Sequence, residues 1–557
     1  MVSVFRENKA HLQNPLFSHY HDLSPSLQKR LAHSWAPVFC EHVFAKIDET
    51  PFAVLYCADN GRPNFPVNIL LALELIKHWK DLTDEELVEQ ASFNFLVTYA
   101  VGLLNLGEEA LSPRTLYEFR SRVYQHAITS GPDADLIFEQ FTQITREFLE
   151  LTGAKVDAQR MDSTFIVPNI QKAGRLALAY DVLYHAVKDC PNDSLSEDLR
   201  EVVTPNFKTT LLYKTKGNGL NSRLESVLAL GGKLREEVAG KPWEKQTSIE
   251  LLKRFLSEQG SYDAVAKQWK AKPSGEISAD SLQSAHDADA TYRKKQTQSS
   301  SGYVCNIAET CNPDNLAQFI TAYDVAKNIT ADTTLLEERL PILKEEMPEL
   351  KDLYVDGGYY SPDVVKIAEQ EAVALHFTDM TGGKCSEDKL PCLAFSIKDQ
   401  QIIVTCPSGH APERAAYKEK KEVLSAHFER NRCLACPLLL HCPIKIQKKE
   451  ASLHVSRKKL VAEAVRATLQ GEVRTEATRM RVAIEGTNSA LKQGQSLGEL
   501  AVRGINKART VVGFKMIGHN FGQLLQWLRR QSAAITKAAK TIKDDVLPQA
   551  QGTFMPG

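Results

Sequence analysis

The sequence lacks any apolar run of the roughly 18 to 20 residues that a membrane-spanning helix needs. Its first residues carry charges where the apolar core of a secretion signal would stand, so we expect a cytoplasmic protein with no membrane partner. A strong excess of one charge is also lacking, because 68 Lys and Arg residues face 69 Asp and Glu residues. This balance excludes a uniformly basic nucleic-acid binder.

The number of cysteines is odd, and a reducing compartment does not favour a disulfide framework. Seven of the 11 cysteines are scattered along the chain. Scattered cysteines are typically buried small apolar side chains or inert thiols. The other four lie close together, at Cys406, Cys433, Cys436 and Cys442.

The positive charge is unevenly distributed along the chain. Residues 411–515 contain 21 Lys or Arg against 10 Asp or Glu, so the rest of the chain is acidic. A polyanion-binding face on an acidic body produces this asymmetry, although a solvated charged surface is the commoner origin of such runs.

A chain of 557 residues is too long for one ordinary core and predicts several domains. Residues 15–150 have helical patterning, including a capping box at Thr83 to Glu86 and a helix start at Ser112 and Pro113. The arginines at 114, 120 and 122 on that last helix either contact DNA or are simply solvated.

Strand and helix patterns then alternate, which predicts an α/β sheet interrupted by a helical insertion at about 170–280. Residues 154–167 form the first expected strand, with Asp162 at its end. We expect Pro341 to cut a helix at 333–347, and a loop-rich segment at 380–450. Helical patterning returns at 455–530, and the tail from residue 531 has few bulky apolar residues, which is typical of flexible ends.

Three acidic residues stand where a structural role is awkward: Asp162, Asp356 directly after an apolar strand and before two glycines, and Glu485 on a helix. Strand-end aspartates often only cap turns, and Glu485 could belong to a surface salt bridge with Arg481. Two Mg²⁺ or Mn²⁺ ions held by such carboxylates would explain the set, because hard cations prefer carboxylate oxygens and activate phosphodiester attack. At helical spacing, Arg481, Asn488 and Lys492 share the face of Glu485.

Several ordered motifs over residues 15–525 make the chain resemble bacterial insertion-sequence DDE transposases with an RNase H-like core and an inserted cysteine cluster. They are MDSTFIVPNI, DADATYRKKQTQSSSGYVCNIAE, YVDGGYYSPD, Arg481-x3-Glu485-x6-Lys492 and the N-terminal helical block. The family often has tyrosine three residues before the arginine, where this chain has Thr478, so no tyrosine role is carried over.

The resemblance implies that Asp162, Asp356 and Glu485 are catalytic and hold two metal ions, and that Arg481, Lys492 and Asn488 contact DNA. It implies water attack at each transposon end, then attack of the released 3′-OH on target DNA. The partners would be double-stranded DNA (terminal inverted repeats and target), with a homodimer bringing two ends together in the nucleoid. A DNA hairpin step is left open.

The cysteine cluster predicts a structural Zn²⁺ site, since zinc favours tetrahedral thiolate sets and a small loop-rich segment gains a fold from the metal. The ligands are Cys406, Cys433, Cys436 and Cys442, with His410 as the substitute. Free or redox-active thiols are the alternative.

The predicted fold class is therefore multidomain α/β: an RNase H-like mixed sheet with an N-terminal helical DNA-binding domain, a helical insertion and a small zinc-binding insertion. The alternatives are a nuclease on the same core that does not join DNA, and a domesticated zinc-containing DNA-binding protein. The expected parts are 1–150 (DNA-binding), 151–169 with 285–380 (catalytic core), 170–284 (helical insertion), 381–455 (zinc insertion), 456–530 (helical part of the core with Glu485) and 531–557 (flexible tail).

Overall fold

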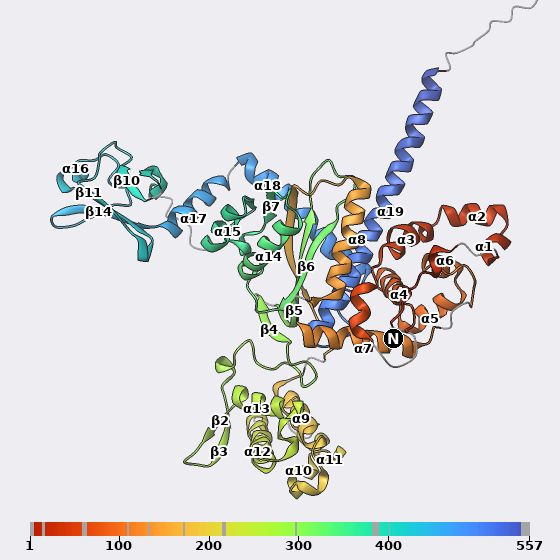
Figure 1. The fold of residues 1–557 in the computed structure, drawn as a ribbon. Helices are drawn as coiled ribbons and strands as arrows, with labels where there is room; N and C mark the ends of the chain where they lie inside the picture. The colour runs from red at the N-terminus through yellow and green to blue at the C-terminus, as the bar shows by residue number, and fades with distance from the viewer. Residues whose placement is uncertain are drawn as a thin grey trace, which may run out of the picture.

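The computed structural model describes residues 5–13, 17–57, 64–107, 111–131, 134–170, 173–213, 219–295, 298–380, 389–399, 401–469 and 471–546. A mixed sheet lies at the centre, between N-terminal helices on one side and a small β unit on the other (Figure 1). A helical insertion lies below the sheet, and the C-terminal helix extends away from the body (Figure 1). The predicted multidomain α/β class with a mixed sheet and many helices is confirmed.

The N-terminal region is helical, as predicted. Thr83 accepts a hydrogen bond from the Glu86 N–H while the Glu86 carboxylate accepts one from Thr83, which completes the expected capping box. Ser112 caps the next long helix, whose first residue is Pro113. The helices are α1 (His19–Asp22), α2 (Pro25–Ala32), α3 (Trp35–His42), α4 (Val67–Lys80), α5 (Asp84–Phe93), α6 (Phe95–Ala100), α7 (Pro113–Ser130) and α8 (Leu136–Thr152).

The central arginine of α7 faces inward. The Arg120 guanidinium lies 2.6 Å from both a Glu74 oxygen and an Asp84 oxygen, and Glu74 is fully buried. Burial raises the pKa of Glu74, against the opposing effect of Arg120. Arg120 is therefore a structural residue that joins α4, α5 and α7 rather than a solvated one.

The central sheet has the order β4-β5-β1-β7-β8, with β6 paired to β5. Strands β4 and β6 pair antiparallel with β5, and β5 pairs antiparallel with β1. Strands β7 and β8 continue the sheet in parallel with β1. The bounds are β1 (Ala158–Ile166), β4 (Thr291–Lys295), β5 (Gln298–Thr310), β6 (Ile320–Lys327), β7 (Asp352–Val355) and β8 (Ala374–Phe377).

Helices cover this sheet on both sides. Helix α14 (Asp332–Glu346) runs through Pro341, so the expected interruption there is wrong; α15 (Pro362–Gln370) packs beside it. Helix α8 and the long α19 (Ile505–Val546) pack against β6, and α19 also contacts α4. The Phe521 ring of α19 meets Phe39 and Trp79, with ring centroids 5.1 and 4.8 Å apart. The N-terminal helices and the sheet therefore share a continuous apolar core.

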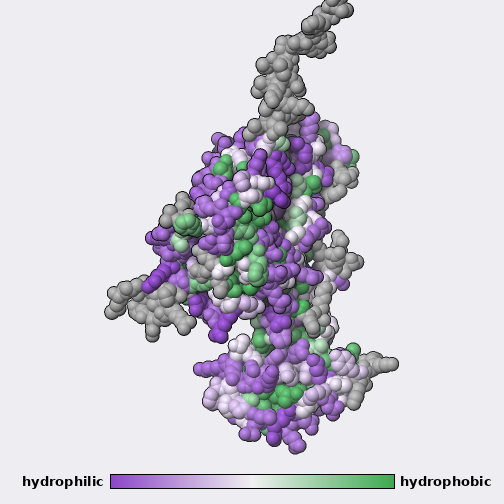
Figure 2. Space-filling model, turned by 90° about the vertical axis from the view of Figure 1, so that its right-hand side faces the viewer, coloured by the Kyte–Doolittle hydropathy of each residue, from purple (hydrophilic) through white to green (hydrophobic). Residues whose placement is uncertain are grey.

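The helical insertion has an apolar core of its own. It forms the lower lobe in Figure 2, where hydrophilic residues cover most of the face in view. Its elements are α9 (Arg175–Lys188), α10 (Glu197–Glu201), α11 (Pro205–Tyr213), α12 (Leu220–Val238), α13 (Thr247–Gln259), β2 (Gly260–Asp263) and β3 (Gln268–Ala271).

The segment expected to be loop-rich is instead a small β unit, so that expectation is wrong. An antiparallel sheet of order β11-β12-β14-β13 encloses buried residues such as Leu424, Phe428 and Leu453. Apolar side chains on alternating positions of β12 and β14 make this core, and Cys406, Cys433 and Cys442 pack against it. The bounds are β9 (Ser396–Lys398), β10 (Ile402–Thr405), β11 (Arg414–Lys418), β12 (Val423–Glu429), α16 (Arg430–Leu434), β13 (Lys445–Ile446) and β14 (Glu450–Ser456).

Two helices return the chain from the β unit to the central sheet. They are α17 (Arg457–Thr468) and α18 (Gly471–Gly494), and α18 packs against β1 and β7. Helix α19 then continues to Val546, into the range predicted as a flexible tail; the rest of that tail, 547–557, lies outside the described residues.

Candidate active site

The three predicted carboxylates come from separate elements. Asp162 lies in the middle of β1, paired with Ile307 of β5, so the expectation that it ends its strand is wrong. Asp356 directly follows β7, as predicted, and Glu485 lies on α18. Their side chains are 14%, 35% and 60% exposed, in the order Asp162, Asp356, Glu485. The site is therefore open on the side of the helix.

One guanidinium joins the three carboxylates. A terminal nitrogen of Arg481 lies 3.4 Å from Asp162 Oδ1 and 3.9 Å from Asp356 Oδ2, and the other lies 3.3 Å from Glu485 Oε1. The Arg481 Nε is buried and has no hydrogen-bond partner among the described residues. The salt bridge between Arg481 and Glu485 exists, but it is one part of a larger cluster rather than an isolated surface pair.

The other two predicted residues of α18 also face Asp162. Asn488 Nδ2 donates a hydrogen bond of 3.1 Å to Asp162 Oδ2, while the buried Asn488 Oδ1 has no partner within the described chain. Burial lowers the pKa of Lys492, whereas the nearby Asp162 carboxylate raises it. The structure thus brings Arg481 and Asn488 into contact with one carboxylate, and Lys492 near enough to interact with its charge.

The electrostatic situation of Asp162 favours a cation beside it. Burial raises the pKa of Asp162 because desolvation disfavours its anionic form, and the Asp356 carboxylate raises it further. The positive charge of Arg481 acts in the opposite direction. A second cation beside Asp162 would also offset the desolvation cost of its anionic form.

The two glycines after Asp356 have different structural roles. The Gly358 N–H donates a 2.7 Å hydrogen bond to Asp356 Oδ1, which fixes that carboxylate as the cap of a short turn. A side chain at Gly357 would place its Cβ 2.7 Å from the backbone of Asp379, too close for any residue but glycine. The YVDGG motif therefore positions Asp356 at the sheet edge.

The carboxylate of Asp332 lies beside both β1 and the turn after β7. Asp332, at the start of α14, accepts a 2.7 Å hydrogen bond from the hydroxyl of Ser163, the residue after Asp162. A Cβ added at Gly358 would lie 3.2 Å from Asp332 Oδ2. Asp332 thus lies between β1 and the turn that follows β7.

A buried ion pair that no local sequence pattern predicts holds α18 on the sheet. Arg160 of β1 lies 2.6 Å from Glu309 of β5, with both side chains almost fully buried. Thr487 of α18 donates a 2.8 Å hydrogen bond to the second Glu309 oxygen, and Arg160 donates one of 3.1 Å to the backbone oxygen of Met480. These contacts fix the helix on which Glu485 lies.

The acidic residues of the DADATYRKK motif have a structural role. Asp287 accepts hydrogen bonds from the Tyr303 hydroxyl at 2.6 Å and the Gly504 N–H at 2.9 Å, and Asp289 accepts one from the Ile505 N–H at 3.3 Å. Carboxylates at a helix N-terminus bond its unpaired N–H groups and complement its dipole. The motif therefore anchors the start of α19, away from the carboxylate cluster.

The four clustered cysteines line one cavity of about 140 Å³ together with His410. Burial raises the pKa of Cys433, and the nearby thiols of Cys406, Cys442 and Cys436 raise it further. None of these cysteines forms a disulfide with another described residue. They come from the turn after β10 and from the segment around α16, so they join two parts of the β unit.

Neither set of side chains is arranged as a closed ligand sphere. Among the described residues, no group of three or more His, Cys, Asp or Glu side chains is placed to hold a metal ion. In the carboxylate cluster, a guanidinium lies where the three acids converge.

None of the described helices reaches both the length and the apolar character that a membrane span requires.

Two family models match the chain. Residues 27–122, from the N-terminal helices, match a family described as "Transposase domain (DUF772)". Residues 405–525, which include the cysteines and α18, match the "Transposase DDE domain". No curated protein and no solved structure matches. Both matched regions are thus similar to transposase domains. More narrowly, the pair of matches indicates an insertion-sequence DDE transposase.

Proposed function

We propose that this transposase cleaves DNA at the ends of its element and joins the released 3′-OH ends to target DNA, using Asp162, Asp356 and Glu485. The observation that carries the proposal is the convergence of these carboxylates, from β1, the end of β7 and α18, on the Arg481 guanidinium. A protein that only binds DNA does not need three carboxylates gathered from distant segments at an open edge.

The chemistry of these side chains suits two Mg²⁺ or Mn²⁺ ions. The cluster offers carboxylate oxygens, which these ions prefer, and its acids already gather around one positive group. The buried, unpartnered Asn488 Oδ1 supplies a further neutral oxygen beside Asp162. When bound, the ions would activate the attacking oxygen and stabilise the leaving one.

The chain's own residues would orient the DNA. Arg481 and Lys492 would bind phosphates near the scissile bond, since a guanidinium pairs with phosphate as readily as with carboxylate. Asn488 holds Asp162 Oδ2, and the Gly358 N–H holds Asp356 Oδ1, so neither carboxylate needs to reorient. Glu485 is the most exposed of the three and would be covered when DNA binds over α18.

We also propose that the sheet is an RNase H-like core. Its support is the arrangement of β6, β5 and β1 as long antiparallel neighbours followed by the parallel β7 and β8. The proposed parts are those expected from the sequence: 1–150 binding DNA ends, 151–169 with 285–380 and 456–530 forming the core, 170–284 and 381–455 inserted. A homodimer would hold two ends together.

A joining assay tests this function. Labelled duplexes carrying the DNA that flanks the coding region are incubated with the protein, supercoiled plasmid and Mg²⁺. We expect 3′-OH cleavage at the element end and labelled strands covalently joined to the plasmid. Cleavage without joining would replace the proposal with a nuclease, and binding without cleavage would replace it with a DNA-binding protein that has lost catalysis.

For the β unit, we propose a structural Zn²⁺ held by Cys406, Cys433, Cys436 and Cys442. The shared cavity and the four thiols support it, because thiolates are the ligands that zinc prefers. The Cys406 N–H donates to the backbone oxygen of His410 at 2.9 Å, which ties the substitute ligand to the same turn. The metal would link this turn to α16.

Replacing Cys433 and Cys436 with serine is expected to remove about one zinc per chain, measured by elemental analysis of protein purified without chelator. The fold of the β unit should survive, because its buried core is made mainly by side chains of β12 and β14, and the thiols only pack against its edge. Hydrogen exchange should rise around α16 and remain low in β12 and β14. Cys57→Ser, at an exposed cysteine, is the control and should keep its zinc. Zinc-free wild-type protein would contradict the assignment.

A further inference from the structure

A groove with basic side chains runs between the helical insertion and the central sheet. It consists of two adjoining pockets of about 620 and 780 Å³, both lined by Ala173, Leu178 and Gln283. Basic residues from the sheet, the insertion and the segment before α19 line it; we call this the junction groove. They are Arg175, Lys208, Arg293, Lys294 and Arg503.

The three arginines of the junction groove are held by neutral oxygens. Arg175 donates to the Gln259 side chain and to the backbone oxygens of Gln259 and Lys272, each at 2.7 Å. Arg293 donates to the backbone oxygens of Asn328 and Thr330, and Arg503 to that of Asn169. Because no carboxylate of the described residues pairs with them, these guanidinium groups are fixed in place with their charge uncompensated.

The two lysines are exposed and free to reach a ligand. Neither Lys208 nor Lys294 has an ion pair within the described chain, and Lys208 Nζ lies 5.7 Å from the centre of the Tyr180 ring. Other lysines of the same insertion differ: Lys233 pairs with Asp198 at 2.6 Å, and Lys253 with Glu250 at 3.0 Å. The Asp181 carboxylate also lines the groove.

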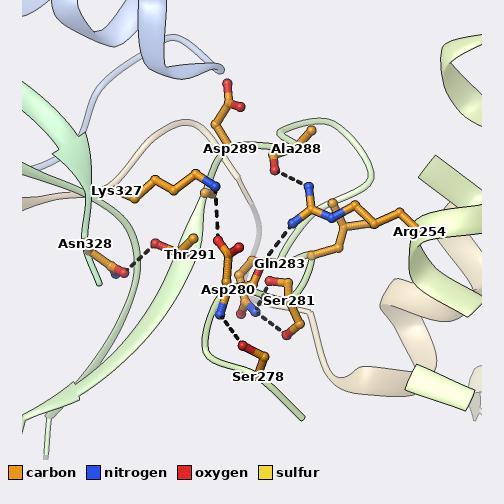
Figure 3. A network of polar contacts seen from close by, with 12 residues as sticks. Arg254, Ser278, Asp280, Ser281, Gln283, Ala288, Asp289, Thr291, Lys327 and Asn328 are labelled. Atoms are coloured by element: carbon orange, nitrogen blue, oxygen red, sulfur yellow. Dashed lines mark hydrogen bonds and ion pairs between the residues drawn. The ribbon is translucent and has the colours of Figure 1, made fainter. Parts of the chain in front are cut away.

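A polar network keeps the two walls of the groove in register (Figure 3). Arg254 of α13 donates to the backbone oxygens of Ala288 and Asp280 at 2.7 and 2.9 Å. The Asp280 carboxylate in turn pairs with Lys327 of β6 at 3.0 Å. Figure 3 shows these residues bridging the insertion and the sheet through the linker that carries Asp280. The basic residues of both walls therefore form a preorganised surface.

The junction groove lies where the chain continues beyond β1, the strand that carries Asp162. From Asp162 the chain passes through the end of β1 to Asn169, whose N–H donates to Val502 and whose oxygen accepts from Arg503. Seven residues of extended chain span at most about 23 Å. That upper limit corresponds to about seven base pairs at 3.4 Å each.

We propose that the junction groove binds the backbone of the DNA duplex within about seven base pairs of the scissile phosphate. The proposal rests on the proposed function, since it takes the carboxylate cluster as the place of cleavage. Fixed, uncompensated cations on both walls match the regular phosphates of a duplex, and phosphate contacts of this kind position DNA without reading its sequence. The groove would hold the helical insertion and the core on the same DNA segment.

The test is the salt dependence of DNA binding by the full chain, measured by fluorescence anisotropy on a duplex of about 40 base pairs. For Lys208→Gln with Lys294→Gln, the slope of log Kobs against log salt should fall in magnitude by about 1.8, since each lost phosphate contact removes about 0.9. Lys208→Arg with Lys294→Arg should keep the wild-type slope. The matched control is Lys233→Gln with Lys253→Gln, whose lysines are already ion-paired.

Equal slopes for the groove variant and the matched control would overturn the proposal. Thermal denaturation of each variant shows that it is folded, and all four lysines are on or beside the surface, away from the carboxylate cluster. Failure of the proposed function looks different: the wild-type chain would then fail to cut DNA in Mg²⁺, whatever the salt slopes. Cleavage by the wild type with an unchanged groove slope rejects the groove alone.

Discussion

Asp162→Asn is expected to reduce Mg²⁺-dependent strand cleavage by at least about 10³-fold while leaving DNA binding within about twofold of wild type. Asparagine keeps the shape of the side chain but removes the charge of the most buried acid in the cluster. The loss should appear as a lower cleavage rate at saturating DNA, measured in single-turnover assays on end-containing duplexes.

The control for this variant is Asp352→Asn. Asp352 lies at the start of β7, four positions before Asp356, and its carboxylate pairs with His376 at 2.7 Å outside the cluster. It should cut DNA at the wild-type rate. Retention of more than about a tenth of the wild-type rate by Asp162→Asn would reject the catalytic assignment.

Local patterns in the sequence predicted the elements that carry Asp356 and Glu485. A short apolar strand followed by two glycines requires a tight turn, and the helical spacing around Glu485 requires a helix. The position of Asp162 was predicted less well, because polar residues in MDST suggested a strand end. The long β5 continues the ladder past Asp162 and gives it a partner at Ile307, which no local pattern contains.

The β unit was missed for a related reason. Its strands are short, and charged residues such as Arg414 and Lys418 stand at their ends, so the segment resembles loops. Its core forms only when β12 and β14 meet, bringing Leu424 beside Val455. Register between strands is a property of the pair and cannot be read from either strand alone.

The largest effect on stability is expected at another pairing that the sequence could not predict, that of Arg160 with Glu309. Arg160→Met should destabilise the core by about 3 to 5 kcal/mol, because it leaves a buried carboxylate without its counter-charge. The measurement is urea unfolding followed by a probe on the central sheet. A second variant, Arg160→Met with Glu309→Leu, should recover much of the loss, since two apolar side chains remove the unpaired charge. Equal stability of the single and double variants would contradict this account.

The loss of stability in Arg160→Met is expected to depend on pH, and its direction follows from the pKa of Glu309. Burial raises the pKa of Glu309, while Arg160 lowers it. A carboxyl group with a raised folded pKa binds protons more tightly in the folded state, so its contribution is present at low pH and is lost as pH rises through that pKa. Removal of Arg160 raises the pKa further. Stability of Arg160→Met relative to wild type should therefore fall as pH rises above the ordinary glutamate pKa of 4.5, and the double variant should lack this fall.

Because Thr487 bonds the same carboxylate, loss of the ion pair should also loosen α18. Hydrogen exchange along α18 then links the stability of this pair to the placement of Glu485.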